Sequence, residues 1–327
     1  MGDPAPCEVS VVIPVYQGER TLGPLVAEIE PLTRGAVTPK GRRFRVGEVV
    51  LVHDGARDDS AGTILQLAGR HDFVLHVWLS RNYGQHPATL AGMACSVCGW
   101  VVTLDEDGQQ DPRDIGALLD EALEHGALLV YATPANAPPH GMVRNLASRA
   151  ASWVFARLLG NRALGRFNSF RLMRGDIARA VAAHCGPDVY LDVALAWVVP
   201  QARHCPLRLR SERGRASGYT LRRLLSHFWR LVLTSGTRPL RLVVVLGLGS
   251  ILVSLAITAF VIHGRLVRQV PVAGWTSMVV ILCLYSGLVL FSLGVIAEYL
   301  GVAVSMAMGR PPYLIVAAPT RRGEDPP

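Results

Sequence analysis

The sequence predicts an α/β fold with a Rossmann-like, mostly parallel sheet, followed by two C-terminal transmembrane helices. Apolar, β-branched runs alternate with helical patterns over the first 135 residues. Polar residues directly follow several of these runs, where open α/β sheets bind their ligands. Two later stretches without charged residues, 242–262 and 271–297, are each long enough to cross a bilayer. The alternative for these stretches is a pair of buried core helices.

The order of the elements supports the parallel sheet. Strands are predicted at 9–15, 46–52, 74–79, 101–104 and 127–132, each an apolar run. Helices are predicted between them at 21–29, 58–67, 87–97 and 115–124, with Thr21 as a possible N-cap of the first. The basic stretch 31–45 is predicted as a loop, 170–173 as an edge strand, and 189–199 as an apolar segment around Asp192.

The strand at 101–104 ends in a cluster of acidic residues, which is the most informative feature of the sequence. Asp105, Glu106 and Asp107 follow it directly, and Asp105, Asp107 and Gln109 alternate along the chain. An extended backbone would project these three oxygen-bearing side chains to one side. Such a donor set suits Mg²⁺ or Mn²⁺, which share their coordination shell with substrate phosphates. The alternative is a solvated acidic turn that caps a helix beginning near Pro112.

Charge and hydropathy together indicate a membrane protein. The 327 residues carry a net charge of +8, and 50% of them are hydrophobic. The chain opens without a cationic leader, so residues 1–215 are predicted to form a cytosolic domain. Residues 216–239 are predicted as an interfacial helix, 240–300 as two transmembrane helices, and 301–327 as a cytosolic tail.

Arginines beside the spans set the predicted orientation, with both termini cytosolic at an inner or plasma membrane. They are Arg230, Arg238 and Arg241 before the first span and Arg310, Arg321 and Arg322 after the second. The amphipathic segments 146–159 and 219–233 are also basic, and the latter is predicted to lie in the headgroup layer. The alternative is an ordinary surface helix. The charge therefore favours anionic lipids as partners over nucleic acid.

Cys95 and Cys98 form a CxxC motif without a second copy elsewhere in the sequence. Their spacing beside small residues is typical of a buried helix face. We therefore interpret them as core residues, with zinc binding or redox chemistry as the alternative.

A set of motifs in one order resembles glycosyltransferase family 2, in particular enzymes that load a sugar onto a polyprenyl phosphate. The motifs are SVVIPVY at 10–16, HDG at 53–55, RNYGQH at 81–86, TLDEDGQQDP at 103–112, PLR at 239–241, AEYLG at 297–301 and RPPYLI at 310–315. The resemblance covers nearly the whole chain. It implies a GT-A catalytic domain, a UDP- or GDP-linked sugar donor, a polyprenyl (undecaprenyl or decaprenyl) phosphate acceptor, Mg²⁺ or Mn²⁺, and inverting transfer of a single sugar.

The resemblance also assigns roles to residues by position. The donor-binding positions are Pro14, Tyr16, Glu19, Asp54, Arg81, Gln85, Asp105 and Glu106. Metal ligation falls to Asp105, Asp107 and Gln109, and the catalytic positions are Asp107, Asp105 and Arg171. The acceptor-phosphate positions are Arg144, Ser148, Arg149, Arg213, Ser217 and Tyr219, although each arginine alone could be a solvated surface charge. The family also implies a possible homo-oligomer, which glycines such as Gly247 and Gly287 in the predicted spans would permit.

The sequence departs from the family pattern at several positions. His53 stands where many relatives have Asp, Ala56 replaces Ser, Asp111 replaces Pro, and Gly218 replaces the Lys of SKY. Ser169 stands where glucosyl relatives carry an Asp. These changes leave a catalytically impaired membrane scaffold as an alternative. A processive polysaccharide synthase is a further alternative, disfavoured because the chain has no Q-x-x-R-W stretch.

Overall fold

The computed structural model describes two compact parts of the chain. The first unit comprises Met1–Gly218 and Pro311–Pro327, and the second comprises Tyr219–Arg310. Within the first unit, the described residues are 6–135, 167–187, 189–208, 210 and 311–317. Within the second, they are 274–310 and isolated positions between 247 and 263.

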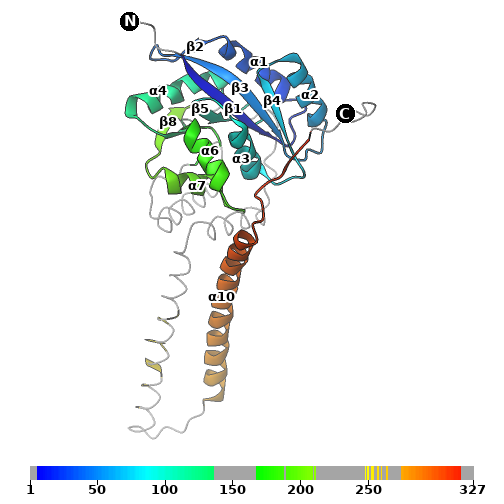
Figure 1. Ribbon diagram of the computed structural model, residues 1–327. Coiled ribbons are helices and arrows are strands. Elements are labelled where there is room, and N and C mark those ends of the chain that lie inside the picture. Colours follow the sequence, from blue (N-terminus) through cyan, green and yellow to red (C-terminus); the bar gives the residue numbers. More distant parts are fainter. Residues whose placement is uncertain are drawn as a thin grey trace. The chain divides into compact units, whose positions relative to one another are not determined.

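A mixed sheet forms the centre of the first unit (Figure 1). Its parallel core consists of β5 (Trp100–Thr103), β1 (Cys7–Val15), β3 (Arg43–His53) and β4 (Val74–Leu79), neighbouring one another in that order. The carboxyl ends of these four strands therefore lie along one edge. This arrangement confirms the predicted parallel α/β architecture.

The sheet continues on both sides of the parallel core. On one side, β7 (Arg171–Arg174) runs antiparallel between β5 and β6 (Leu129–Pro134), and β8 (Arg203–Leu207) pairs parallel to β6. On the other side, β9 (Ile315–Val316) runs antiparallel to β4. The short β2 (Ala36–Val37) forms a hairpin with the start of β3.

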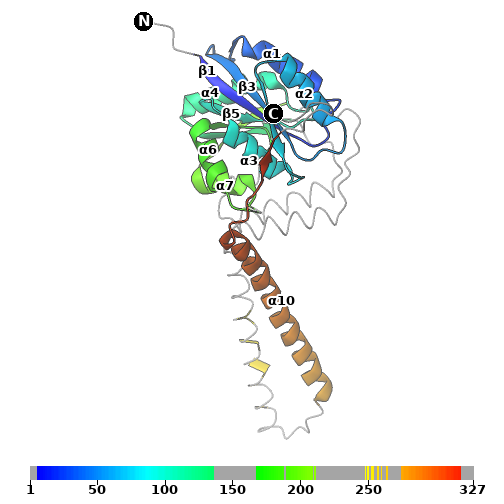
Figure 2. The same ribbon diagram turned by 45° about the vertical axis from the view of Figure 1, so that its right-hand side comes forward.

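Helices cover both faces of the sheet, as Figures 1 and 2 show. One face carries α1 (Leu22–Thr33), α2 (Ser60–Arg70) and α4 (Ile115–His125), which follows the short helix η1 (Pro112–Asp114). The other carries α3 (Gln85–Cys95), α6 (Gly175–His184) and α7 (Leu191–Val198).

Side chains of β1 alternate between the two cores, as the period of a strand requires. Val11 and Ile13 pack on the first face, whereas Val12 packs on the second. On that second face α3 lies close to the sheet at Gly92, where a Cβ atom would come within 2.4 Å of Cγ1 of Val12. Both faces of the strand are therefore buried, which explains its nearly continuous apolar sequence.

Several predicted boundaries were wrong. The first helix runs past residue 29 to Thr33 with Pro31 inside it, and Thr21, its N-cap residue, makes no side-chain capping hydrogen bond. The predicted loop at 31–45 contains β2 and the start of β3, where Phe44 is buried between two exposed arginines. The segment predicted as an edge strand is β7, which lies inside the sheet. The elements α6, β8 and β9 were not predicted.

The second unit contains the apolar helix α10 (Trp275–Ala307). Its segment Tyr285–Val304 is long and apolar enough to cross a membrane, and it is the single such helix among the described residues. The predicted first span, 242–262, lies largely outside these residues, and the predicted interfacial segment 216–239 lies wholly outside them. The prediction of two spans is therefore not confirmed.

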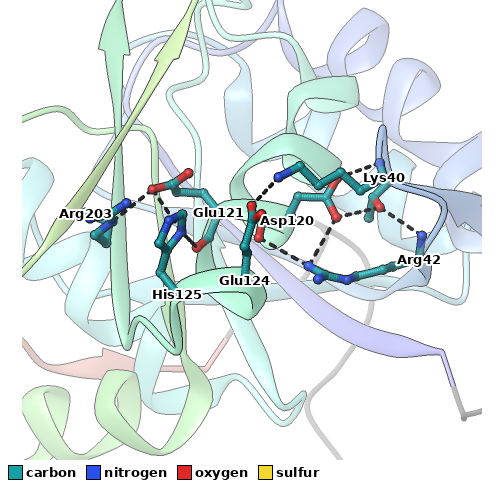
Figure 3. A network of polar contacts seen from close by, with 8 residues as sticks. Lys40, Arg42, Asp120, Glu121, Glu124, His125 and Arg203 are labelled. Atoms are coloured by element: carbon teal, nitrogen blue, oxygen red, sulfur yellow. Dashed lines mark hydrogen bonds and ion pairs between the residues drawn. The ribbon is translucent and has the colours of Figure 1, made fainter.

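A polar network fastens the turn before β3 to α4 (Figure 3). The buried Asp120 carboxylate accepts hydrogen bonds from the Thr38 hydroxyl at 2.7 Å and from the Lys40 backbone N–H at 2.9 Å. At its rim, Lys40 pairs with Glu124, and both side chains are exposed. Asp120 thus supplies a hydrogen-bond acceptor to donors that are shielded from water. The exposed ion pair between Lys40 and Glu124 is weakened by solvent and contributes little.

Replacement of Asp120 should therefore destabilise the fold far more than replacement of Glu124. Asp120→Ala leaves buried donors unsatisfied, which costs about 2–3 kcal/mol. Glu124→Ala removes an exposed ion pair and should cost about 0.5 kcal/mol or less. Thermal unfolding of the full chain in detergent, followed by tryptophan fluorescence, measures both. Equal melting temperatures for the two variants would contradict this assignment.

The strand β9 closes the β4 edge of the sheet. Ile315 and Val316 pair with Leu79 and Trp78, and the Ser80 N–H donates to the Leu314 carbonyl at 3.0 Å. Truncation after Arg310 should therefore expose that edge and promote aggregation. Truncation after Ala317 keeps β9 and should behave as the full chain does. Size-exclusion chromatography of the two truncated proteins in detergent compares them, and identical monodisperse profiles would show that β9 is dispensable.

Candidate active site

Polar residues from several elements meet at the carboxyl edge of the parallel core. Tyr16 follows β1, Asp54 follows β3, and Asp105 lies two residues beyond β5. Gln85 is the first residue of α3, which follows β4. Because parallel strands end on the same side, the sheet brings together residues up to 89 positions apart along the chain.

Asp105 is the centre of this group. Its Oδ1 accepts from the Gln85 amide at 2.6 Å, and its Oδ2 accepts from the Gln110 amide at 2.9 Å and from the Ser169 hydroxyl. Burial raises the pKa of the Asp105 carboxyl, and the hydrogen bond from Ser169 opposes that rise. The nearby negative charge of Asp107 also raises it. Three donors therefore fix the orientation of this carboxylate.

Glu106, a predicted donor-binding residue, bridges two loops at this edge. Its carboxylate accepts from the backbone N–H groups of Tyr16 at 2.9 Å and Gln17 at 3.0 Å. It therefore connects the loop after β5 to the loop after β1. This contact also explains the close packing at Gly18, where a Cβ atom would lie 3.0 Å from Oε2 of Glu106.

Asp54 holds the loop between β4 and α3. The side chain is buried and accepts from the backbone N–H groups of Tyr83 at 2.7 Å and Gly84 at 2.8 Å. Burial raises the pKa of Asp54, and the two backbone hydrogen bonds partly offset this effect. Gly55 follows with a φ of 60°, and a Cβ there would approach the Asn82 backbone nitrogen to 2.6 Å. The HDG motif thus builds a tight crossing of two loops.

Two aromatic contacts flank this crossing. The Arg81 guanidinium lies over the Tyr83 ring, 4.8 Å from its centroid. The His53 ring contacts Trp78 with centroids 4.6 Å apart, and burial lowers the pKa of His53. This burial favours the neutral form of the His53 imidazole.

The predicted metal ligands lie together on the loop after β5. Asp107 is exposed, and its Oδ1 accepts from the Gln109 backbone N–H at 3.0 Å. The charge of Asp107 reaches the Asp105 carboxylate. No cluster of three His, Cys, Asp or Glu side chains is found in the described part of the chain. Two carboxylates and an amide nevertheless fit Mg²⁺ or Mn²⁺, which takes one or two protein carboxylates beside substrate phosphates.

Arg171, a predicted catalytic residue, is buried behind Asp105. Its guanidinium pairs with Asp192 and its Nε donates to the Thr103 hydroxyl at 3.2 Å. The Tyr131 hydroxyl donates to the same Asp192 oxygen at 3.0 Å. Arg171 is only 3% exposed, and its positive charge acts to lower the pKa of Asp105.

The remaining predicted positions divide into two groups. Pro14 is half-buried within β1, and Glu19 is exposed, with its carboxylate accepting from the Asp59 backbone N–H at 3.3 Å. The predicted acceptor-phosphate positions all lie outside the described residues; they are Arg144, Ser148, Arg149, Arg213, Ser217 and Tyr219.

The structure adds residues that sequence reasoning missed. Gln110 both donates to Asp105 and accepts from its backbone N–H at 2.9 Å, and Asp192 neutralises Arg171. Arg210 contacts Asp111 at 2.7 Å. The available signals were the second Gln in DGQQDP and a lone acid inside an apolar segment. Of the CxxC residues, Cys98 is buried but lies beyond the end of α3, whereas Cys95 is the last residue of that helix and is half-buried, so the predicted core role holds only for Cys98 and the shared helix face was wrong.

Comparisons with known proteins agree with this geometry. Residues 10–181 match the family described as glycosyl transferase family 2. A curated relative from Pseudomonas aeruginosa, an undecaprenyl-phosphate 4-deoxy-4-formamido-L-arabinose transferase, is 34% identical over 94% of this chain and 89% of its own length. A protein of the same name from Klebsiella pneumoniae is 29% identical over 94% of this chain and 92% of its own.

Solved structures share the fold at lower identity. Mannosyl-3-phosphoglycerate synthase from Rubrobacter xylanophilus is 17% identical with a TM-score of 0.51, covering 72% of this chain and 74% of its own. Glucosyl-3-phosphoglycerate synthase from Mycobacterium tuberculosis, solved with Mn²⁺ and UDP, is 18% identical with a TM-score of 0.50, covering 71% and 80%. The sheet is therefore of the GT-A type, and the chain belongs to glycosyl transferase family 2.

Proposed function

We propose that this protein transfers a single sugar from a nucleoside diphosphate sugar to a polyprenyl phosphate, with inversion, at the cytosolic face of an inner or plasma membrane. The observation that carries the proposal is the similarity to undecaprenyl-phosphate sugar transferases along 94% of the chain, which includes the segment around α10. The relatives' names make an amino sugar related to arabinose the first donor to test.

The reaction needs little proton transfer. An oxygen of the acceptor phosphate attacks the anomeric carbon, and the bond from that carbon to the diphosphate breaks with its electron pair on the departing nucleoside diphosphate. The acceptor's second pKa is near 6, so its oxygen is already anionic at neutral pH. A general base is therefore unnecessary, and the site has to stabilise the charge of the leaving group.

The polar residues at the carboxyl edge of the parallel core are suited to stabilising the charge of the leaving group. Asp107 and Gln109, with Asp105, would hold Mg²⁺ or Mn²⁺, which would neutralise the diphosphate charge. Gln85, Gln110 and Ser169 keep Asp105 oriented, and Asp54 and Glu106 keep the loops around it in place. Pro14, Tyr16, Glu19 and Arg81 are proposed to contact the nucleoside. Arg171 is buried, and we propose that its positive charge balances the negative charge of the carboxylates at the site.

The acceptor side of the proposal rests on cationic and hydroxyl side chains. The proposed phosphate contacts are Arg144, Ser148, Arg149, Arg213, Ser217 and Tyr219, because a phosphate dianion at a membrane surface requires charged hydrogen-bond donors. We further propose two membrane spans with both termini in the cytosol, and close helix contact in a homo-oligomer at Gly287 and Gly294.

A donor screen tests the proposal directly. The full chain in detergent, with polyprenyl phosphate and Mg²⁺ or Mn²⁺, is given UDP- and GDP-linked sugars, including 4-deoxy-4-formamido-L-arabinose. We expect one glycolipid product that bears a single sugar. We also expect that chelation of the metal abolishes formation of this product. Long products would indicate a polysaccharide synthase. The absence of product from every donor would favour a scaffold.

Asp107→Ala should lower kcat by about 10²–10³-fold, because it removes a group that stabilises developing charge in the transition state. Asp72→Ala, on the exposed turn before β4, is the matched control and should retain full activity. Initial rates with the best donor give both values. An Asp107→Ala enzyme as fast as the control would exclude this role.

Ser169→Ala should lower kcat by about 10–100-fold, because a hydrogen bond to a charged group contributes about 1.5–3 kcal/mol. Ser169→Thr retains the hydroxyl and should recover most of the loss. Thr33→Ala, which removes a hydroxyl bonded to the Glu30 carbonyl on α1, serves as the control. If Ser169→Ala keeps the parent kcat, Asp105 does not depend on this hydroxyl.

A further inference from the structure

Arg210 connects three elements that are distant in sequence. It lies three residues beyond β8 and, along the sequence, three residues before Arg213, a proposed acceptor-phosphate contact. Its guanidinium contacts Asp111 at 2.7 Å and Glu28 of α1 at 2.8 Å. Its backbone N–H donates to the Gln109 carbonyl at 3.0 Å. Arg210 therefore connects the end of the loop 105–111, which we call the acidic loop, to α1 and to the chain leaving β8.

Asp111 is the point through which this contact reaches the acidic loop. Its carboxylate is the N-cap of η1 and accepts from the Arg113 backbone N–H at 3.0 Å. Because the carboxylate also pairs with Arg210, its position is fixed from both sides.

An isolated surface ion pair would not support a functional role, since such pairs contribute little. Arg210 differs because its side chain is shared between two carboxylates and its backbone holds the carbonyl of Gln109. The side chain is 36% exposed, so the pairs are partly shielded from solvent. Its contacts converge on the loop that carries Asp105, Asp107 and Gln109.

We propose that Arg210 is a positioning residue, which fastens the loop 105–111 to α1 and to the chain leaving β8 and thereby keeps the proposed metal ligands of that loop in place. This inference rests on the proposed function for its catalytic consequence. The restraint on the loop is independent of that function.

Amide hydrogen exchange of the full chain in detergent measures the restraint without any substrate. The reporting amides are those of Asp105, Gln109, Arg113 and Asp114, which bond to side chains or carbonyls within the same loop. We expect Arg210→Met and Asp111→Asn each to speed exchange across 105–114 by about tenfold. Because both break the same contact, the double variant should exchange no faster than the faster single variant.

Arg174→Met is the matched control, because Arg174 forms a similar exposed pair with Asp176 after β7. It should leave exchange in 105–114 unchanged. Arg210→Lys keeps the charge and should restore part of the protection. Exchange in Arg210→Met equal to that in Arg174→Met, or additive effects of the two single variants, would overturn the proposal.

Kinetics then separate the positioning role from a purely structural one. With the donor identified by the screen, Arg210→Met should lower kcat about tenfold, with a melting temperature equal to that of Arg174→Met and with rescue by Lys. A kcat equal to that of the control would refute the positioning role. If no donor is turned over by the parent chain but the exchange effect appears, the proposed function fails and the restraint stands.

Discussion

The polar edge of the sheet depends on carboxylates that accept hydrogen bonds from neighbouring loops. Asp54 receives two backbone N–H groups from the loop after β4, and Glu106 receives two from the loop after β1. Each acid thus compensates donors that would otherwise be left unpaired. Asp105 can be oriented by side chains alone because these two acids already fix the loops around it.

The acidic residues at this edge differ in solvent exposure, and their contacts differ accordingly. Asp54 is buried and Glu106 is partly buried, and both are committed to backbone donors. Asp107 is exposed, with a single described hydrogen bond to one of its oxygens. A cation and a diphosphate would therefore meet Asp107 before the other acids. The helix η1 begins at Pro112, as the alternative expected, but its N-cap is Asp111 and not a member of the acidic triplet that follows β5.

Local patterns were sufficient to predict the parallel core but not the rest of the sheet. The strand Val74–Leu79 was predicted with its observed bounds because an apolar run there lies between turn residues. In contrast, β9 has two residues and pairs with a strand more than 230 positions away, so no local pattern reveals it. The strand β8 was missed because Arg203 and Pro206 interrupt its apolar character.

In the candidate site, too, local sequence patterns predicted neighbouring residues but not contacts between distant segments. Asp105, Asp107 and Gln109 were predicted as a group because they are neighbours in sequence behind one strand. The donor from Ser169 depends on the antiparallel register of β7 beside β5, which pairs Arg171 with Thr103. Arg171 was assigned from its motif, and only the fold reveals that Asp192 and Tyr131 surround it. Contacts across the sheet were therefore inaccessible to sequence reasoning.

The return of the chain to the sheet at β9 has a topological consequence. Both β8, before the second unit, and β9, after it, are strands of one sheet, so both ends of the intervening chain lie on the side of the membrane that holds this sheet. A chain that leaves and rejoins the same compartment crosses a bilayer an even number of times. This parity is compatible with the two spans proposed above and is not compatible with a single crossing by α10.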